Sequence, residues 1–288
     1  MNFDQNESLE LARARNVRDA LMEDIGRGDW TARLVPEREV ARAQVTAKEA
    51  AVLCGQQWFD DCIHALDPAA VIAWERHDGD AVSSGSRLCT IEARARALLS
   101  AERSALNFLQ MLSGVATKAR EYVQAIAGAS PNPRGVRLVD TRKTLPGLRQ
   151  AQKYAVRVGG GGNHRMALWD GILIKENHIA AAGGIGQVLA QARALDAGVD
   201  IQIEVETLDE LRTALDNGAT NILLDDFSLP DVCRAVAFTA GRAVLEVSGG
   251  VDLVTIREIA ATGVDRISVG KLTKDVRAVD LSMRVIDA

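Results

Sequence analysis

The chain has 288 residues, of which 47% are hydrophobic and 25% are charged. This length and composition are typical of a globular protein with one large domain or two smaller ones, and they exclude a disordered, collagen-like or disulfide-stapled protein. The apolar runs have the length of strands and are too short to span a membrane. The first ten residues, MNFDQNESLE, are too acidic for a signal or transit peptide. We therefore expect a soluble cytoplasmic protein.

The charge is unevenly distributed along the chain. The 34 Lys and Arg against 39 Asp and Glu give a net charge of −5, which argues against nucleic acid as a partner. Between Arg134 and Lys175, however, nine basic residues accompany only Asp140 and Asp170, so this segment carries +7. Some of these charges fit the solvent face of a helix, whereas those beside turns and strand ends indicate a pocket for a small anion.

The four cysteines show neither a CxxC spacing nor a paired histidine pattern. Such cysteines are most often reduced, buried and apolar in their behaviour. We therefore expect buried thiols without a chemical role at Cys54, Cys62, Cys89 and Cys233.

The first part of the chain mixes helical and extended patterns. Apolar residues recur at helical spacing over Leu9–Met22 and, most strongly, over Ser100–Ala127. A short helix is expected at residues 56–66, and strands are expected within residues 40–53 and at Val71–Glu75. This half is therefore predicted to be α+β, with helices and an antiparallel sheet.

Beyond Pro131-Asn132-Pro133, strand-like and helical stretches alternate regularly. The β-rich runs are Val136–Asp140, Ile172–Lys175, Ile201–Glu206, Ile222–Asp225, Val244–Val247 and Arg266–Val269. The helical stretches between them are Leu148–Val158, Ile185–Leu195, Leu208–Asn217, Leu229–Ala240 and Leu253–Ala261. The alternation predicts a parallel sheet with crossover helices, either a TIM-like barrel or a large open sheet.

Polar residues and glycines at the carboxyl ends of these runs favour the barrel, because a barrel builds its active site at that face. In IQIEVE, Gln202, Glu204 and Glu206 alternate with apolar residues, so all three are expected to point into the barrel. An open sheet offers no comparable place for the two carboxylates.

Two basic segments are candidates for binding an anion. At residues 140–144, in DTRKT, a guanidinium, an ammonium and hydroxyl groups meet at one turn. At Gly159–Gly162, four glycines expose backbone N–H groups immediately before Asn163-His164-Arg165. The second segment is not a GxGxxG motif between a strand and a helix, so it does not indicate a dinucleotide fold.

Charged side chains at other strand ends allow several chemistries. Lys175 could form a Schiff base or act as a fixed charge, and His178 is expected to orient its neighbours rather than act as a base. Glu204 and Asp225 suit Mg²⁺ or ribose hydroxyls. The acids in ILLDDF resemble the PRPP motif of Rossmann-like phosphoribosyltransferases, but FSLP follows instead of a Thr/Gly-rich loop, so we reject that match.

The last two strand ends predict a phosphate site. Ser248-Gly249-Gly250 and Val269-Gly270-Lys271 combine small residues, backbone N–H groups and a hydroxyl. In a barrel, the loops after the last two strands commonly hold phosphate.

Ordered motifs along almost the whole chain resemble quinolinate phosphoribosyltransferase (nicotinate-nucleotide diphosphorylase, carboxylating), a type II phosphoribosyltransferase family. In the second half these motifs are DTRKTLPGLR, GGGGNHRMALWDGILIKENHI, IEVE, ILLDDF, EVSGG and SVGKLT. In the first half they are EDIGRGDWT, AVLCG and ARALLSAERSALNFLQMLSGVAT.

The resemblance implies an α/β fold with two domains. An N-terminal α/β open-faced sandwich at residues 1–114, to which a tail at about 276–288 returns, would precede an incomplete, seven-stranded TIM-like α/β barrel at residues 115–275. The family implies a homodimer that converts quinolinate and PRPP into nicotinate mononucleotide, diphosphate and CO₂ in de novo NAD biosynthesis, with Mg²⁺ as cofactor.

The resemblance also implies the roles of individual residues. The quinolinate-binding residues would be Arg103, contributed across the dimer interface, with Thr141, Arg142, Lys143, His164, Arg165 and Lys175. The PRPP- and phosphate-binding residues would be Lys143, Lys175, Glu204, Asp225, Ser248, Gly249, Gly250, Val269, Gly270 and Lys271. The catalytic residues would be Lys143, Lys175, Glu204 and Asp225. Mg²⁺ would bind mainly through PRPP, with Glu204 and Asp225 as candidate protein ligands.

Three other functions remain open at this point. A homologous protein associated with molybdenum transport shares the TRKT…GG…HR skeleton, but its NHR and IKENH signatures are altered, whereas both are intact here. A Schiff-base aldolase would use Lys175 as its nucleophile. A barrel that only binds phosphorylated metabolites would bind PRPP without turnover.

Overall fold

The computed structural model describes residues 6–287 and divides them into two compact units. The first unit consists of the described parts of Met1–Arg120, Thr144–Gly160 and Thr273–Ala288. The second unit consists of Glu121–Lys143 and Gly161–Leu272. The domain limits expected from the sequence, 1–114 and 115–275, stay a prediction.

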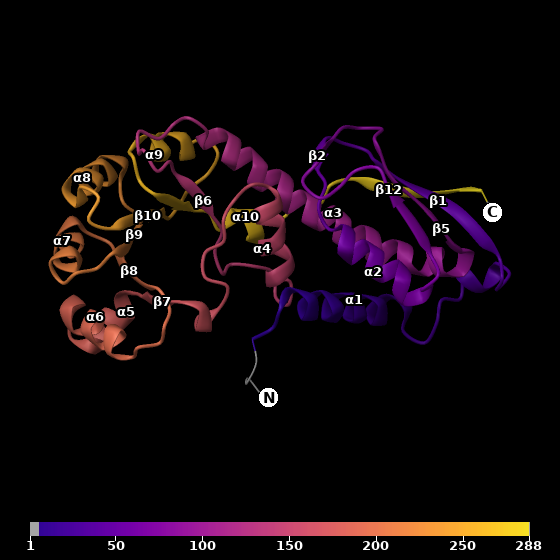
Figure 1. Cartoon of the computed structure of the whole chain (residues 1–288), viewed down its shortest axis with the longest axis horizontal. Helices are drawn as coiled ribbons and strands as arrows, with labels where there is room; N and C mark the ends of the chain where they lie inside the picture. The colour runs from indigo at the N-terminus through magenta and orange to yellow at the C-terminus, as the bar shows by residue number, and fades with distance from the viewer. Residues whose placement is uncertain (1–5, 288) are drawn as a thin grey trace. The chain divides into compact units, whose positions relative to one another are not determined.

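The first unit contains a four-stranded antiparallel sheet in the order β12-β1-β5-β3 (Figure 1). Its strands are β1 (Val40–Ala47), β3 (Val71–Trp74), β5 (Arg87–Arg94) and β12 (Leu281–Asp287). Burial alternates along β1 and β5, so one face is apolar and enclosed while the other is polar. The strand β12 pairs with β1, which brings the end of the described chain into this sheet.

Helices pack on this sheet and form the core of the first unit. They are α1 (Leu9–Ile25), α2 (Gln56–Leu66), α3 (Ala95–Ile126) and α4 (Arg149–Val158). Phe59 of α2 meets Trp74 of β3 edge-on, with ring centroids 5.5 Å apart, which anchors α2 to the sheet. A short ladder of β2 (Ala51–Val52) and β4 (Ala81–Val82) and the 3₁₀ turn η1 (Ala32–Leu34) complete the unit.

The second unit contains a parallel sheet of six strands in the order β6-β11-β10-β9-β8-β7. The strands are β6 (Arg137–Val139), β7 (Ile172–Ile174), β8 (Ile201–Val205), β9 (Asn221–Asp225), β10 (Val244–Ser248) and β11 (Arg266–Ser268). The resemblance implied seven strands, whereas the described residues form six, and a single parallel bridge between Val139 and Gly162 extends the edge at β6. Gly159, Gly160 and Gly161 precede this bridge, and glycines disfavour a longer strand. The prediction of a barrel-like α/β fold is confirmed, with six strands and one bridge.

Helices follow one another along the outer side of the parallel sheet (Figure 1). They are α5 (Glu176–Ala182), α6 (Ile185–Ala194), α7 (Leu208–Asp216), α8 (Leu229–Thr239) and α9 (Ile256–Ala261). Thr207 caps α7 by accepting the Glu210 N–H, and Ser228 caps α8 by accepting the Asp231 N–H. The short helix α10 (Lys271–Lys274) and the turn η2 (Leu168–Asp170) lie after β11 and before β7.

Two smaller expectations have clear outcomes. Cys54, Cys62 and Cys89 are free and buried as predicted, but Cys233 is exposed, so the prediction is wrong for that residue.

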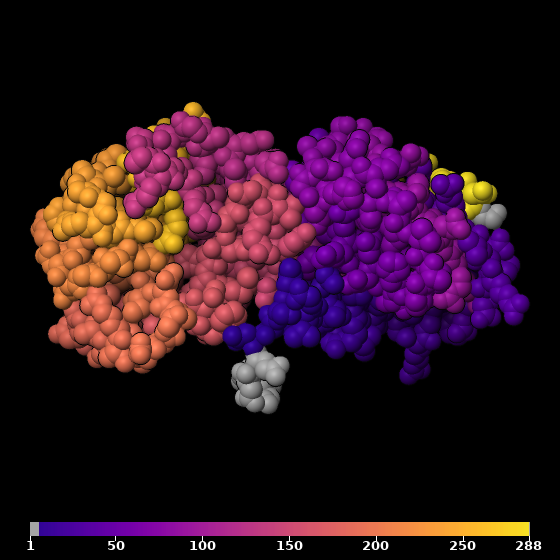
Figure 2. All heavy atoms as spheres, viewed as in Figure 1, coloured from indigo at the N-terminus to yellow at the C-terminus, as the bar shows by residue number. Residues whose placement is uncertain are grey.

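Among residues 6–287, no helix is both long and apolar enough to cross a membrane. In the space-filling view, atoms of α1 lie at the surface of the first unit (Figure 2), in keeping with the exposed Leu11 and Met22 on that helix.

Candidate active site

The carboxyl ends of the parallel strands bring most of the predicted site residues to one edge of the second unit. Because parallel strands all point the same way, the segments that follow them are neighbours in the order of the sheet. From β6 to β7, these segments are residues 140–143, 269–271, 248–250, 225–226, 206 and 175–178. The candidate site is therefore an arc of loops around one edge of the sheet.

Lys175 and Glu204 form an ion pair at two adjacent strand ends. The Lys175 Nζ lies 3.0 Å from Oε1 and 2.8 Å from Oε2 of Glu204. Burial raises the pKa of Glu204, although its hydrogen bond to Lys175 acts in the opposite direction. His178 Nδ1 accepts the Lys175 backbone N–H at 3.1 Å, which is the orienting contact expected for this histidine. A Schiff base at Lys175 would require this ion pair to break.

Asp225 supplies a second carboxylate beside Glu204. It ends β9, which pairs with β8, and its negative charge contributes to the raised pKa of Glu204. Across residues 6–287, no group of three or more His, Cys, Asp or Glu side chains is placed to hold a metal ion. Two carboxylates suit a Mg²⁺ ion that keeps several waters and shares substrate phosphates, rather than one enclosed by protein ligands.

Asp140 anchors the segment that follows the glycine run. It is completely buried at the end of β6. Its Oδ1 accepts the His164 backbone N–H at 2.9 Å, and its Oδ2 accepts the Asn163 Nδ2–H at 2.6 Å. In the next residue, Thr141, the side-chain Oγ1 accepts the Lys143 backbone N–H at 3.0 Å. Both basic segments are thus held in place at the same strand end.

Arg142 and Arg165 place two guanidinium groups within electrostatic reach of each other. Burial, followed by the positive charge of Arg142, lowers the pKa of Arg165. Arg165 Nη1 also donates to the Gly171 carbonyl at 2.9 Å, which holds the side chain beside the start of β7. An anion near these two groups offsets their mutual repulsion, and a planar carboxylate matches the geometry of a guanidinium.

The predicted phosphate loops approach their neighbours closely at two glycines. Gly249 has φ +98°, and a Cβ there would lie 1.9 Å from Asp226 Oδ1. A Cβ at Gly270 would lie 3.2 Å from Lys143 Cδ, so the loops after β11 and β6 touch. Val269 is different, because its backbone N–H donates to the Val139 carbonyl at 3.0 Å. This N–H is used in the hydrogen bonding of the sheet, so it does not make the expected phosphate contact.

Other predicted residues lie elsewhere. Arg103 is exposed on α3 in the first unit. Glu206 lies beyond the end of β8 and is exposed, unlike Gln202 and Glu204, so the expectation that it points into the barrel is wrong. Gly159 belongs to the first unit, where a Cβ would lie 2.4 Å from the Ala116 carbonyl oxygen. This glycine is therefore needed for close packing of α4 against α3 rather than for an anion.

The sequence predicted that Gln202 points into the barrel, but the polar layer to which it belongs was not predicted. His164 Nε2 lies 2.8 Å from Gln202 Oε1, and Gln202 Nε2 donates to Glu246 Oε2 at 3.1 Å. Glu246 is completely buried and forms an ion pair with Arg266 Nε at 3.1 Å. The alternation of apolar and acidic residues in VLEVS was the available signal, and it matches that in IQIEV. A cavity of about 300 Å³ at the amino ends of the strands adjoins this layer at Gln202, Asn221 and Arg266.

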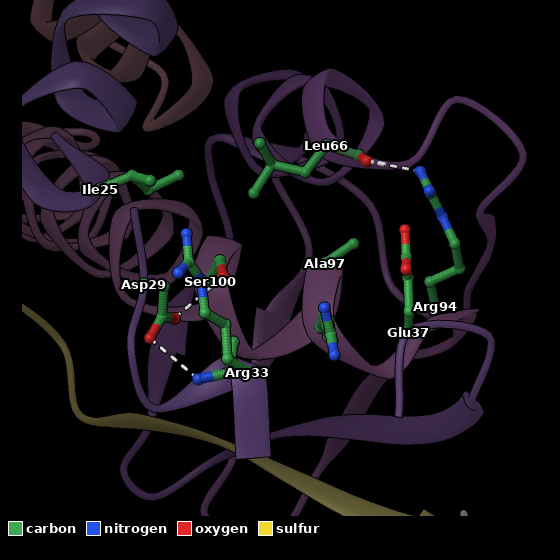
Figure 3. A pocket seen from close by; sticks show the side chains of 10 residues that line it. Ile25, Asp29, Arg33, Glu37, Leu66, Arg94, Ala97 and Ser100 are labelled. Atoms are coloured by element: carbon green, nitrogen blue, oxygen red, sulfur yellow. Dashed lines mark hydrogen bonds between the residues drawn. The ribbon is translucent and has the colours of Figure 1, made fainter. Parts of the chain in front are cut away.

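The first unit has a cavity of its own, of about 290 Å³ (Figure 3). Two of its charged groups, Asp29 and Arg94, are hydrogen-bonded within the unit. Asp29 accepts the Ser100 hydroxyl and the Ala32 backbone N–H, which lower its pKa, and Arg94 donates to the Leu66 carbonyl at 2.8 Å. None of the site residues predicted from the sequence lines this cavity.

Comparison with known proteins covers nearly the whole chain. The family model described as "Quinolinate phosphoribosyl transferase, N-terminal domain" matches residues 29–113, and the one described as the C-terminal domain matches residues 115–284. This chain belongs to the quinolinate phosphoribosyltransferase family. The resemblance stated from the motifs is thereby confirmed.

Individual members of the family are similar over most of their length. The chain is 40% identical over 266 residues to a probable nicotinate-nucleotide pyrophosphorylase (carboxylating) of Bacillus subtilis, covering 92% of this chain and 90% of that protein. It is 37% identical to a mitochondrial quinolinate phosphoribosyltransferase (decarboxylating) of Nicotiana tabacum, covering 92% and 80%. The solved nicotinate-nucleotide pyrophosphorylase of Francisella tularensis is 43% identical, with a TM-score of 0.91 over 99% of this chain and 100% of that one.

Proposed function

We propose that this chain transfers the phosphoribosyl group of PRPP to quinolinate, with loss of CO₂, and that the loops at the carboxyl ends of the parallel strands carry the reaction. The observation that supports this most directly is the set of cations around one strand-end arc, within a family of quinolinate phosphoribosyltransferases. The catalytic domain would span residues 115–275.

Quinolinate is a pyridine dicarboxylate, so its pocket needs several fixed cations. Arg142, Arg165 and Lys175 supply them, and the electrostatic strain between the two guanidinium groups is relieved when a carboxylate binds. Thr141 and Lys143 flank the pocket, and His164 lies in the segment that carries Arg165.

PRPP would bind across the other loops of the arc. Ser248, Gly249, Gly250 and Gly270 offer small residues at the ends of β10 and β11 for the 5-phosphate, with Lys271 beside them. Lys143 reaches over Gly270 from the neighbouring loop and would contact phosphate there. Glu204 and Asp225 would face the ribose, where their charge stabilises the cationic character that develops at the anomeric carbon.

The site residues position the two substrates and stabilise the charge that develops during the reaction. None of them is proposed to form a covalent intermediate. The pyridine nitrogen attacks the anomeric carbon as the bond to diphosphate breaks, which gives a pyridinium dicarboxylate. The electron pair of the bond to the 2-carboxylate then stays on the ring, CO₂ leaves, and the carbon takes a proton. Lys175 is held by Glu204 in the free chain and would turn toward the substrate carboxylate, where it fixes the ring.

Glu204 and Asp225 fit a Mg²⁺ ion shared with PRPP. Their adjacent strand ends and their electrostatic coupling place two carboxylates together. When bound, Mg²⁺ would offset the charge of the departing diphosphate. The protein's own part is to hold the two carboxylates at neighbouring strand ends, with Glu204 paired to Lys175 in the free chain.

A homodimer would complete the site, because Arg103 lies in the first unit and is exposed there. We propose that Arg103 of one subunit binds quinolinate in the other. Mixing Arg103→Ala subunits with Lys175→Met subunits should restore part of the activity that each variant lacks alone. A mixture as inactive as its parents would show that the sites are self-contained.

The cytoplasm remains the expected location. The relative in Nicotiana tabacum is named as mitochondrial, so location varies within the family. Localisation of the tagged chain in its own cells would decide the point.

The activity itself is tested by incubating the protein with Mg²⁺, PRPP and quinolinate while nicotinate mononucleotide and CO₂ are measured. The expected result is equal amounts of both products, and no product with nicotinate as substrate. Absence of product from quinolinate would contradict the proposal. Borohydride trapping of a carbonyl substrate on Lys175 would instead indicate a Schiff-base aldolase, and PRPP binding without turnover would indicate a binding protein.

A further inference from the structure

A row of polar side chains lies inside the parallel sheet, close to the Lys175–Glu204 pair. Gln202 precedes Glu204 by two residues on β8, so both side chains are on the same face. Through Leu223 of β9, Glu204 is in register with Glu246 of β10. Glu246 is completely buried and Gln202 is 3% exposed. Barrel interiors are normally filled by branched apolar residues, so this layer calls for an explanation.

The layer ends at His164, in the segment that carries the Arg165 cation. His164 Nε2 lies 2.8 Å from Gln202 Oε1, and Gln202 Nε2 donates to Glu246 Oε2 at 3.1 Å. Arg266 Nε lies 3.1 Å from the same Glu246 oxygen and supplies the counter-charge. The other Glu246 oxygen, Oε1, lies 3.5 Å from His164 Nε2, so the carboxylate also faces the imidazole directly. On the other side of the imidazole, Nδ1 accepts the Arg165 backbone N–H at 2.8 Å.

The chemistry of these groups fixes the direction of every hydrogen bond. A carboxylate only accepts, so the amide nitrogen of Gln202 must face Glu246 and its oxygen must face His164. An amide oxygen also only accepts, so His164 Nε2 must carry the hydrogen. Nδ1 then has a lone pair, which is what the Arg165 N–H requires.

We propose that Glu246, directly and through Gln202, is a positioning residue that keeps the hydrogen of His164 on Nε2 and its Nδ1 as an acceptor, and thereby fixes the backbone of Arg165 for binding quinolinate. The identity of the ligand rests on the proposed function. In the other tautomer, or in the imidazolium form, an Nδ1–H would oppose the Arg165 N–H, and the segment would have to shift. Asp140 fixes the opposite end of the same segment by accepting the His164 N–H.

The burial of Glu246 supports a directional role over simple packing. A buried carboxylate and guanidinium cost more to desolvate than apolar residues of the same volume, and replacing such a pair by apolar residues is often neutral or stabilising. An apolar residue would fill the space but could not orient the Gln202 amide. The hydrogen-bond direction is thus the property that Glu246 adds.

The tautomer can be measured on the unmodified protein. The chain has four histidines, so nitrogen NMR of histidine-labelled protein gives few signals, and His164→Gln identifies the relevant one. At neutral pH we expect the His164 signals of a neutral ring with the proton on Nε2. A proton on Nδ1, or on both nitrogens, would overturn the proposal whether or not the protein turns over quinolinate.

The positioning role is tested by Glu246→Gln. The amide side chain has the shape of the carboxylate but can donate a hydrogen bond as well as accept one. Gln202 then loses its fixed orientation, and His164 should show a mixture of tautomers. We expect the KM for quinolinate to rise about tenfold, while kcat and the KM for PRPP change less than about twofold. Unchanged quinolinate KM, or equal increases in both KM values, would contradict the proposal.

Two controls separate this effect from general damage. Glu258→Gln makes the same chemical change at an exposed position of α9 and should leave all parameters and the His164 signals unchanged. If Glu246→Gln does not fold, Gln202→Leu interrupts the same relay while leaving the Glu246–Arg266 pair, and the same split in KM values is expected. A wild-type protein that makes no nicotinate mononucleotide would contradict the proposed function, whereas the NMR result stands independently.

Discussion

In the antiparallel sheet of the first unit, polar and apolar side chains alternate, and the polar ones face solvent. In the parallel sheet of the second unit, both faces are covered, yet Gln202, Glu204 and Glu246 are enclosed by it. The first arrangement stabilises by burying apolar area and places little demand on hydrogen-bond geometry. In the second arrangement, burying charged groups lowers stability through desolvation. The same burial holds the charges at fixed positions for a ligand.

This contrast has a consequence for mutations. Changes to single charges should impair activity most in the parallel sheet, and changes in the antiparallel sheet should alter stability with little effect on turnover. Each of the following variants tests one side of that contrast.

The largest effect is expected at Lys175. Lys175→Met removes a cation from the proposed quinolinate pocket and leaves the largely buried Glu204 without its bidentate partner. We expect kcat/KM to fall about 10³-fold or more, as when a preorganised charge is lost from an active site. Steady-state kinetics with both substrates measures it, with the exposed Lys48→Met as control. Activity within a factor of ten of wild type would contradict the assignment.

Arg142→Ala should separate the two substrates. Losing one charge-assisted contact to a carboxylate should raise the KM for quinolinate about 100-fold, while the KM for PRPP changes less than about twofold. The matched control is Arg234→Ala, since Arg234 is exposed and forms an ion pair with Asp231 on its own helix. Equal losses for both substrates would place Arg142 outside the quinolinate pocket.

Gly249→Ala should act on PRPP instead. The added methyl group would collide with Asp226, at 1.9 Å from its Oδ1, and the backbone has φ +98°. We expect the KM for PRPP to rise about tenfold because the phosphate loop must shift. Gly241→Ala is the control, with φ +76° and nothing within 4 Å of the added Cβ. It should lose only about 1 kcal/mol of stability from backbone strain; an equal rise in KM there would refute the specific role of Gly249.

Asp60→Asn should change the pH dependence of stability and not activity. Burial raises the pKa of Asp60 to about 6, although Trp74 Nε1 donates to it at 2.9 Å. Because the folded state holds this proton more tightly, the stabilisation is present below the unfolded pKa of 3.8 and is lost as pH rises through about 6.

The size of this effect is modest because Asp60 is partly exposed. After allowance for solvent screening, the wild type should lose about 1 kcal/mol between pH 4 and pH 7 relative to Asp60→Asn. Urea unfolding at the two pH values measures the difference, with the exposed Asp24→Asn as control. A parallel pH dependence in wild type and Asp60→Asn would contradict the raised pKa.

Much of the fold follows from local patterns, and the misses have physical reasons. The helix expected at residues 56–66 is α2, and each expected strand of the second unit is present within two residues of its expected ends. The strand β5 was missed because it runs into α3 at Ala95 with no glycine or proline between them. The helix α5 was missed because seven residues are too few to show a helical period.

The candidate site was predictable where it depends on strand ends and not where it depends on strand neighbours. Lys175 and Asp225 follow from polar residues that end apolar runs, and Glu204 follows from the alternation in IQIEVE. The link from His164 through Gln202 to Glu246 requires β8 and β10 to lie on either side of β9, which no local pattern specifies. For the same reason, the use of the Val269 N–H in the sheet became clear only from its pairing with Val139.

We propose that strand-end cations of the second unit recognise two carboxylates on a pyridine ring. Calorimetric titration of the wild-type protein with quinolinate and with nicotinate, which has one carboxylate fewer, measures this recognition. Quinolinate should bind about 100-fold more tightly, because it makes one additional charge-assisted contact. Equal affinity for the two ligands would contradict it.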